Sequence, residues 1–332
     1  MPENHKPRFG MYWAAGCGGC EIAVINIHEK LLDVDANFTP VFWPVALDAK
    51  YADVEGMPDG YIDLCFFNGA IRSDENAEMA RLLRRKSGIL VAFGACASEG
   101  GIPSLGNIGS AQEIIDTAFS TISTDNPLGL RPQPHYAAPE GELRLPRLSA
   151  SVRALDQVVP VDYFMPGCPP ESSQIEAVVE LAIQAFKGQA SLPPPGSVIG
   201  AGNSTVCDEC PRIRTDKTIH AIKRMATFQP NLTDCLLEQG LLCAGAATRS
   251  GCQARCPQAN APCSGCYGPA VQGSEQGVRF LTAIASVTAG NTHEEAALVL
   301  DQIVDPLGTF YRYGLAHSLM HRARPQPERR DE

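Results

Sequence analysis

The sequence predicts an α/β fold, in which a parallel sheet with helices on both faces is followed by an irregular, cysteine-rich domain. In the first half, short apolar stretches of strand length alternate with segments of helical periodicity, as in a parallel sheet covered on both sides. In the second half, eight cysteines lie between residues 207 and 266 with few periodic segments among them, which indicates that metal helps to fold this part. The proline-rich linker 191–196 therefore separates a flavodoxin-like domain, 1–190, from a metal-binding domain, 197–332.

Strands and helices alternate along the first half. The expected strands are residues 8–13, 39–45, 61–71, 88–98 and 158–165, the fourth of which runs into a loop. The expected helices are residues 21–32, 74–85, 110–121 and 171–187. Ser73 offers a hydroxyl that caps the second helix, and the basic last turn of that helix suits a helix C-terminus.

The remaining segments are less regular. Residues 123–157 are rich in proline and polar residues and predict a long surface insertion, with His135 as a surface residue. In the tail, 271–332, one helix is expected over 273–288. A second should follow Thr292, which forms a capping-box pattern with Glu295, and should stop before Pro306. The final RARPQPERRDE is charged and is expected to be disordered.

Composition excludes several classes of protein. The net charge of −10 argues against a nucleic-acid partner. No apolar run reaches the length of about 18 residues that a membrane span requires, and the N-terminus lacks a signal sequence, so we expect a cytoplasmic location. Reducing thiol pools there keep cysteines out of disulfides, so 13 cysteines point to metal.

Four cysteines follow predicted strands. Cys17 and Cys20 follow the first, Cys96 the fourth, and Cys168 the last. Because the carboxyl ends of parallel strands share one edge of a sheet, these four side chains should form one site. Glycines beside them allow backbone to approach a cluster and supply N–H donors to its sulfides. These glycines are Gly16, Gly18, Gly19, Gly94 and Gly167.

Two simpler interpretations compete for these cysteines. A CxxC after a first strand is also typical of a thioredoxin-like redox pair, and cysteine is also a small buried hydrophobe. Neither explains why Cys96 and Cys168 occupy matching turns. Cys65 differs, because it lies inside a strand between Leu64 and Phe66, and we assign it to the core.

Eight further cysteines suffice for two four-cysteine sites. Divided by chain order, the first site holds Cys207, Cys210, Cys235 and Cys243, and the second holds Cys252, Cys256, Cys263 and Cys266. An interleaved division is also compatible with the sequence. Zinc is the competing metal, because four-cysteine zinc sites use paired CxxC motifs as well. The Cys256-Pro257 step and the final CxxCYGP favour iron–sulfur loops.

Three motifs resemble a known family. GCGGCE (16–21), GACAS (94–98) and PGCPP (166–170) are similar to the proximal-cluster motifs of the small subunit of [NiFe] hydrogenases, and related forms occur in the cluster-bearing subunit of respiratory complex I. The resemblance implies that Cys17, Cys20, Cys96 and Cys168 hold a proximal [4Fe-4S] cluster. It assigns the first C-terminal group to a distal cluster and the second to a medial one. Many members have proline at the position of Cys256, and a cysteine implies a full [4Fe-4S] cluster there.

Other stretches resemble one branch of that family. VFWPVALDAKY (41–51), FFNGAIR (66–72) and CLLEQGLLCAGAATRSGC (235–252) are similar to the viologen-reducing, deazaflavin-independent cytoplasmic hydrogenases that associate with heterodisulfide reductase. The resemblance implies that dihydrogen is split in a separate large subunit and that this chain itself carries no nickel–iron site. Electrons would pass through three [4Fe-4S] clusters to an iron–sulfur adaptor subunit and a heterodisulfide reductase-like complex.

Alternatives remain for the function and for two residues. The chain could instead serve a hydrogenase that delivers electrons to a nicotinamide or deazaflavin module, or be a zinc-stabilised structural subunit. Glu21, beside Cys20, is a candidate for proton movement at the subunit interface, or simply a first-turn carboxylate that the helix dipole favours. Arg72 either donates a hydrogen bond near the proximal cluster or pairs with an interface carboxylate.

Overall fold

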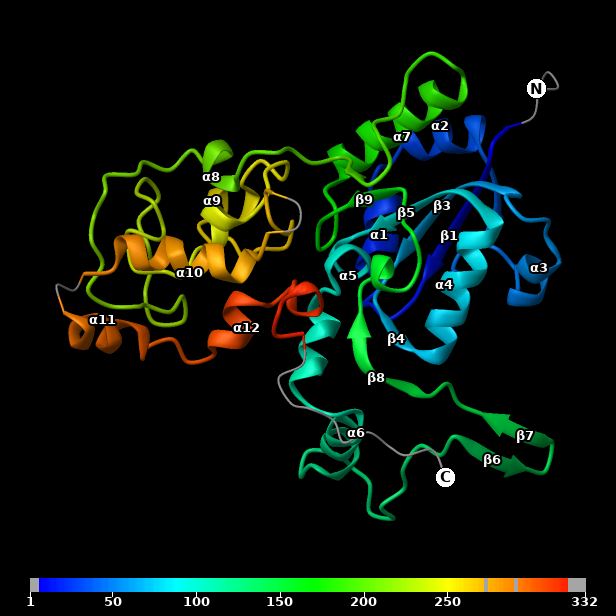
Figure 1. Ribbon diagram of the computed structural model, residues 1–332, viewed down its shortest axis with the longest axis horizontal. Coiled ribbons are helices and arrows are strands. Elements are labelled where there is room, and N and C mark those ends of the chain that lie inside the picture. Colours follow the sequence, from blue (N-terminus) through cyan, green and yellow to red (C-terminus); the bar gives the residue numbers. More distant parts are fainter. Residues whose placement is uncertain (1–5, 272–273, 290–291, 322–332) are drawn as a thin grey trace.

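The computed structural model describes residues 6–271, 274–289 and 292–321. Figure 1 shows an α/β lobe beside a lobe of loops and short helices. The first lobe is built on a six-stranded sheet in the order β10-β9-β5-β3-β1-β2, and all its strand pairs are parallel. Its strands are β1 (Arg8–Trp13), β2 (Thr39–Phe42), β3 (Ile62–Asn68), β5 (Ser87–Phe93), β9 (Tyr163–Met165) and β10 (Ser197–Val198). The α/β prediction is confirmed.

Two apolar cores cover the two faces of this sheet, which is why its central strands read as continuous apolar runs. On one face pack α3 (Tyr51–Gly56), α4 (Asp74–Lys86) and α5 (Ala95–Glu99), through side chains such as Val54, Leu83 and Ala97. On the other pack α1 (Gly19–Ile25), α2 (Lys30–Asn37) and α7 (Ser172–Phe186), through side chains such as Val24 and Ile175. Cys65 lies fully buried in the first core, as expected.

Several element boundaries differ from the prediction. The single helix expected over 21–32 is wrong, because His28, with φ of 50°, adopts a left-handed conformation and separates α1 from α2. The strand expected to reach residue 98 ends at Phe93, and the next residues form α5. The strand expected over 158–165 begins only at Tyr163. The capping role of Ser73 is confirmed, since its hydroxyl accepts a hydrogen bond from the Asn76 N–H at 3.2 Å.

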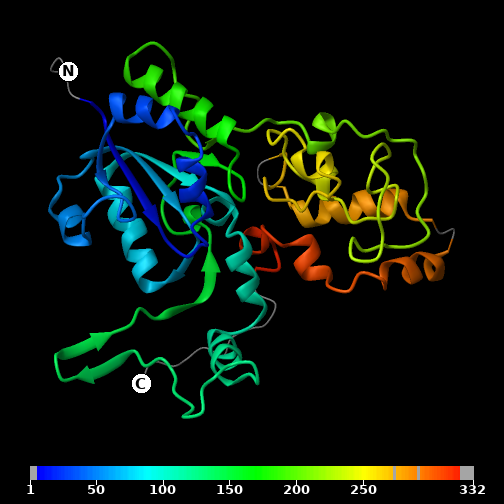
Figure 2. The same ribbon diagram turned by 180° about the vertical axis from the view of Figure 1, so that it is seen from behind.

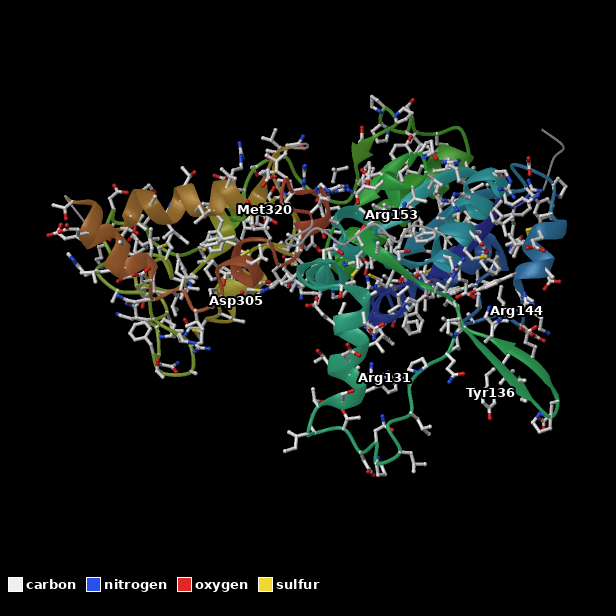
Figure 3. All side chains as sticks on the ribbon, turned by 60° about the horizontal axis from the view of Figure 1, so that its bottom comes forward. Arg131, Tyr136, Arg144, Arg153, Asp305 and Met320 are labelled. Carbon is white, nitrogen blue, oxygen red and sulfur yellow. The ribbon has the colours of Figure 1, made fainter. Side chains whose placement is uncertain are left out.

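The predicted insertion is partly a surface feature and partly core. After η1 (Ile102–Ile108) and α6 (Ala111–Ser120), the strands β6 (His135–Ala138) and β7 (Gly141–Arg144) form an exposed hairpin. Figure 3 shows Tyr136 and Arg144 on this hairpin, away from the body of the protein. The prediction is wrong for 148–157: β8 (Leu148–Arg153) pairs with β4 (Ile71–Ser73), and Leu155, in the turn η2 (Leu155–Gln157), is fully buried.

The second lobe has little regular structure around its cysteines. Its elements are α8 (Val206–Glu209), η3 (Ala244–Ala247), α9 (Arg255–Gln258), α10 (Gln276–Val287), α11 (His293–Leu300), α12 (Pro306–Phe310) and η4 (Leu315–His317). The two expected tail helices are present as α10 and α11, and Thr292 accepts a hydrogen bond from the Glu295 N–H. The tail continues into α12, because Pro306 begins a helix and does not only end one. The segment RARPQPERRDE lies outside the described residues.

The C-terminal segment returns to the α/β lobe. Figure 2 shows the red end of the described chain lying between the two lobes. The sheet also extends beyond the linker 191–196, since β10 pairs with β9, and the division into two domains remains a proposal. No helix in the described part of the chain is long and apolar enough to span a membrane.

Candidate metal centres

The four strand-end cysteines are brought together at the carboxyl edge of the sheet. Cys17 lies in the loop after β1, Cys20 in α1, Cys96 in α5, and Cys168 after β9. Burial raises the pKa of Cys20, and the thiols of Cys96, Cys168 and Cys17 raise it further. Burial likewise raises the pKa of Cys96 to about 12, with Cys168 and Cys17 adding to the effect. Four thiols whose charges interact in this way form one cluster of sulfur donors, which we call the proximal group.

Glycines at this edge leave room for sulfur. A Cβ atom on Gly94, whose φ is +85°, would collide with the sulfur of Cys20. A Cβ on Gly101 would lie 2.7 Å from the sulfur of Cys96. The backbone therefore approaches the thiols more closely than any other residue type permits. A donor set of four thiols in a glycine-lined cradle fits an iron–sulfur cluster.

The thiols of the eight C-terminal cysteines interact both within and between the two sets expected from chain order. Burial raises the pKa of Cys207 to about 12, and the thiols of Cys243, Cys235 and Cys210 also raise it; these four we call the distal group. Burial raises the pKa of Cys266 to about 12, and the thiols of Cys168, Cys252 and Cys256 also raise it. The pKa of Cys263 is raised by burial, then by the thiol of Cys243 and less by that of Cys266; we place Cys263 with Cys252, Cys256 and Cys266 by chain order and call these four the medial group. This grouping is the division by chain order, and the role of these cysteines as ligands stays a prediction.

The three groups adjoin one another. The backbone N–H of Cys168 points at the thiol of Cys266 and opposes the rise of its pKa, so the proximal group meets the medial group there. The backbone N–H of Cys263 donates to the sulfur of Cys243 at 3.3 Å, which joins the medial group to the distal group. In the described ranges, no three His, Cys, Asp or Glu side chains are placed as ligands of a single metal ion.

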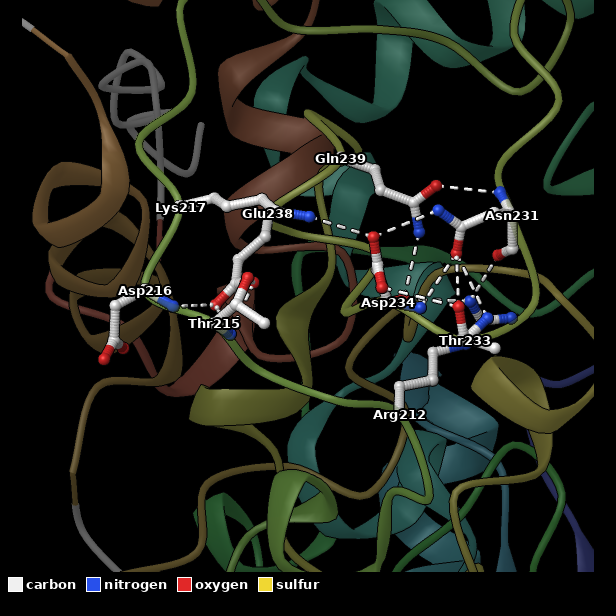
Figure 4. Close-up of polar contacts among 9 residues, drawn as sticks. All are labelled: Arg212, Thr215, Asp216, Lys217, Asn231, Thr233, Asp234, Glu238 and Gln239. Atoms are coloured by element: carbon white, nitrogen blue, oxygen red, sulfur yellow. Dashed lines mark hydrogen bonds and ion pairs between the residues drawn. The ribbon is translucent and has the colours of Figure 1, made fainter.

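A polar network holds the loops of the distal group (Figure 4). The guanidinium of Arg212, which is 9% exposed, donates to the backbone carbonyls of Asn231 and Asp234 at 2.8 and 3.0 Å. The carboxylate of Glu238 accepts from the backbone N–H groups of Thr215 and Asp216, at distances of 2.9 to 3.0 Å. These contacts tie the loop after Cys210 to the loop that carries Cys235. The sequence pattern did not reveal them, since Arg212 looks like any surface arginine.

Glu21 is a buried carboxylate beside the proximal group. It lies in the first turn of α1, is 3% exposed, and accepts hydrogen bonds from Trp43 Nε1 at 2.6 Å and Asn68 Nδ2 at 2.9 Å. Burial raises the pKa of Glu21. The hydrogen bonds from Trp43 and Asn68 lower it, but by less, so the pKa is raised overall. The sequence pattern did not reveal either partner. Arg72, in β4, donates to the carbonyl of Ser149 at 3.2 Å.

A separate ionic site lies at the seam between the lobes, where a cavity of about 390 Å³ is lined by Glu99, Asp156, His317 and other residues. His317 Nδ1 lies 3.1 Å from Glu99 Oε2, and His317 Nε2 lies 2.8 Å from Asp156 Oδ1. Burial alone would lower the pKa of His317, but the hydrogen bonds to Asp156 and Glu99 outweigh it and raise the pKa from 6.5 to about 10. No sequence motif singled out His317.

This shift predicts a pH dependence of stability. Below pH 6.5 His317 is protonated in both the folded and the unfolded chain, so the bridge contributes fully. Between 6.5 and about 10 only the folded chain keeps the proton, so the free energy of unfolding should fall as the pH rises. The contribution is on the order of 2 kcal/mol, because the side chain is 29% exposed and water screens it.

Denaturant unfolding across this pH range checks the prediction. The gap in stability between the parent and His317→Gln should narrow from pH 6.5 to pH 10. The control is His135→Gln, which removes a histidine that pairs with Glu142 on the exposed hairpin and should leave the pH profile unchanged. A constant gap between parent and His317→Gln would contradict the prediction.

Comparisons with known proteins identify the family. The family model described as "NADH ubiquinone oxidoreductase, 20 Kd subunit" matches residues 17–182. The iron–sulfur subunit of the F420-non-reducing hydrogenase of Archaeoglobus profundus is 39% identical over 318 residues, which cover 92% of this chain and 95% of that protein. The chain belongs to the F420-non-reducing hydrogenase small subunits. The corresponding subunit of the Methanothermobacter marburgensis enzyme is 36% identical over 324 residues, with 95% of this chain and 96% of that one covered.

This membership confirms the resemblance seen in the motifs. As a small subunit of a [NiFe] hydrogenase, the chain is part of an oxidoreductase that acts on hydrogen and partners with a large subunit. The family implies iron–sulfur clusters, in agreement with the 13 cysteines. The fold is also that of the recombinant [NiFeSe] hydrogenase of Desulfovibrio vulgaris Hildenborough, with a TM-score of 0.52 at 17% identity over 80% of this chain and 95% of that one.

Proposed function

We propose that this small subunit relays electrons from dihydrogen oxidation in the large subunit, through three [4Fe-4S] clusters, to an acceptor in the cytoplasm. The acceptor is an iron–sulfur adaptor subunit with a heterodisulfide reductase-like complex. The observation that carries the proposal is the continuous series of cysteine groups, in which Cys168 meets Cys266 and Cys263 meets Cys243. A row of three four-thiol groups, each in contact with the next, is what an electron relay requires.

Each group has a proposed place in the relay. The ligands are Cys17, Cys20, Cys96 and Cys168 for the proximal cluster, Cys252, Cys256, Cys263 and Cys266 for the medial cluster, and Cys207, Cys210, Cys235 and Cys243 for the distal cluster. Each cluster, when bound, takes up and releases one electron. Cys17 is exposed at the edge of the sheet, and exposed apolar side chains lie close by in the chain, including Trp13, 41% exposed, and Ile22, 57% exposed. This surface supports docking of the large subunit beside the proximal group.

Glu21 is the proposed residue for proton movement at that interface. Its position follows Cys20 directly, and Trp43 and Asn68 hold its two carboxylate oxygens in place. The first turn of α1 also favours a carboxylate through the helix dipole, so the same position serves folding. A Glu21→Gln variant removes both the carboxyl proton and the charge that the helix dipole favours, so its proton transfer has to be compared with its free energy of unfolding.

Metal analysis of this protein, purified without oxygen and counted per chain, tests the relay. Three clusters require about twelve irons and twelve sulfides in this chain. If the C-terminal groups hold about two zinc ions per chain in place of iron, their assignment as iron–sulfur sites is wrong, and a structural subunit is favoured. The subunits that co-purify with this chain identify the acceptor. A nicotinamide- or deazaflavin-binding module among them, with no heterodisulfide reductase-like subunit, would favour the alternative acceptor.

Cys256→Pro tests the division of the eight C-terminal cysteines. Cys256 lies in the first turn of α9, where proline is tolerated. We expect the medial cluster to lose one iron and become a three-iron cluster, with the matching signal in electron paramagnetic resonance. Cys256→Ser is the control, since its oxygen can still bind iron. An unchanged spectrum for Cys256→Pro would show that Cys256 is no ligand and that the division is wrong.

A further inference from the structure

We propose that the C-terminal segment 311–319, here called the strap, fixes the separation between the proximal and the medial groups, with His317 as the positioning residue. The importance of that separation for electron transfer rests on the proposed function. The mechanical role rests only on contacts between described residues. The strap touches an element that carries a proximal cysteine at one point and a loop that carries medial cysteines at another.

The proximal contact is made through His317. It bridges Glu99, at the end of α5, and Asp156, in η2, with distances of 3.1 and 2.8 Å. Helix α5 is only five residues long and carries Cys96 near its start, so a contact that holds its last residue holds the cysteine as well. Next to His317, the carbonyl of Ala316 accepts a hydrogen bond from Gln157 Nε2 at 2.8 Å.

The medial contact is made by residues on either side of His317 in the chain. The hydroxyl of Tyr313 lies 3.1 Å from that of Ser264, which sits between the medial cysteines Cys263 and Cys266. Glu275, just before α10, accepts hydrogen bonds from the Tyr311 hydroxyl at 3.0 Å and from the Leu319 N–H at 2.6 Å. One short segment therefore holds both sides of the seam.

The charges of Glu99 and Asp156 explain why a histidine at position 317 can bridge them. The two carboxylates lie on opposite sides of the ring, and an imidazolium presents one N–H to each. Elsewhere the seam is crossed by an ion pair between Arg255 and Glu171 at 3.0 Å and by the Tyr267 hydroxyl, which accepts from the Glu171 N–H at 2.9 Å. These other contacts should keep the lobes together when His317 is replaced, so that only the position of α5 relaxes.

The test compares His317→Gln with His321→Gln in the complete hydrogenase complex. His321 is an exposed histidine two residues beyond the strap and serves as the matched control. In His317→Gln we expect the electron paramagnetic resonance spectrum to show a weaker magnetic coupling between the reduced proximal and medial clusters. We also expect a wider spread of coupling values, because the distance between the clusters is no longer fixed. We also expect hydrogen exchange of the α5 backbone to become several-fold faster. His317→Arg, which keeps two charged donors, should restore both.

The outcomes separate the two proposals. If the magnetic coupling and the α5 hydrogen exchange of His317→Gln equal those of the parent, the proposed role of the strap is wrong, even if all three clusters are present. If metal analysis finds no clusters, the proposed relay fails, and hydrogen exchange in α5 alone still decides the role of the strap. Should His317→Gln fail to fold, Asp156→Ala removes one of the two bridging contacts and gives the same readouts: faster exchange in α5 supports the proposal, and unchanged exchange overturns it.

Discussion

Replacing Gly94 with alanine should remove the proposed proximal cluster. Gly94 has φ of +85° and ψ of 162°, a conformation open almost only to glycine, and a side chain there costs on the order of 1–3 kcal/mol. The added Cβ would also strike the sulfur of Cys20. We therefore expect the iron content to fall by about a third of the twelve atoms that three clusters require, and the protein to unfold at lower denaturant concentration.

A second glycine isolates the effect of the sulfur. Gly196 has the same φ of +85°, but a Cβ built there meets nothing within 4 Å. Gly196→Ala should therefore show the backbone strain alone and retain its full iron content. Iron and sulfide assays of the two variants, purified side by side without oxygen, make the comparison. Full iron in Gly94→Ala would mean that the cradle around Cys20 is not needed for the proximal cluster.

Leu155→Ala should destabilise the α/β lobe by about 2–5 kcal/mol. Leu155 is fully buried in the core under α4, although its segment reads as a surface insertion. Truncation leaves a cavity that the surrounding side chains fill only partly. It also loosens η2, where Asp156 contacts His317. The contact between the two lobes at His317 should therefore weaken together with the core.

Leu143 provides the matched control for this variant. It belongs to the same predicted insertion but lies on the exposed hairpin, with 59% of its surface accessible. Leu143→Ala should change the free energy of unfolding by no more than about 0.5 kcal/mol. Denaturant titration followed by circular dichroism measures both. Equal effects of the two substitutions would show that 148–157 contributes no more to the core than the hairpin does.

The parts of the fold that follow from local periodicity were predictable. Buried parallel strands leave continuous apolar runs, and the cysteines after them had to meet at one edge because parallel strands all point the same way. The capping roles of Ser73 and Thr292 were readable for the same reason, since each depends on residues three positions apart.

The missed features depend on contacts between distant parts of the chain. His317 meets Glu99 and Asp156 across 218 and 161 residues, and nothing near His317 signals those partners. Helix α5 is too short to show a helical period. The polar composition of 123–157 concealed the strand β8 and the turn η2, because only a few side chains of this segment, such as Val152 and Leu155, face the core.

The strap also imposes an order on biosynthesis. All four proximal cysteines lie within the first 168 residues, whereas His317 lies 149 residues beyond Cys168. The proposed proximal ligands are therefore all present while the seam beside them is still open. Once the C-terminal segment docks on α5 and η2, that side of the site is closed. Synthesis from N- to C-terminus thus completes the four proximal cysteines before the residues that close the seam are made.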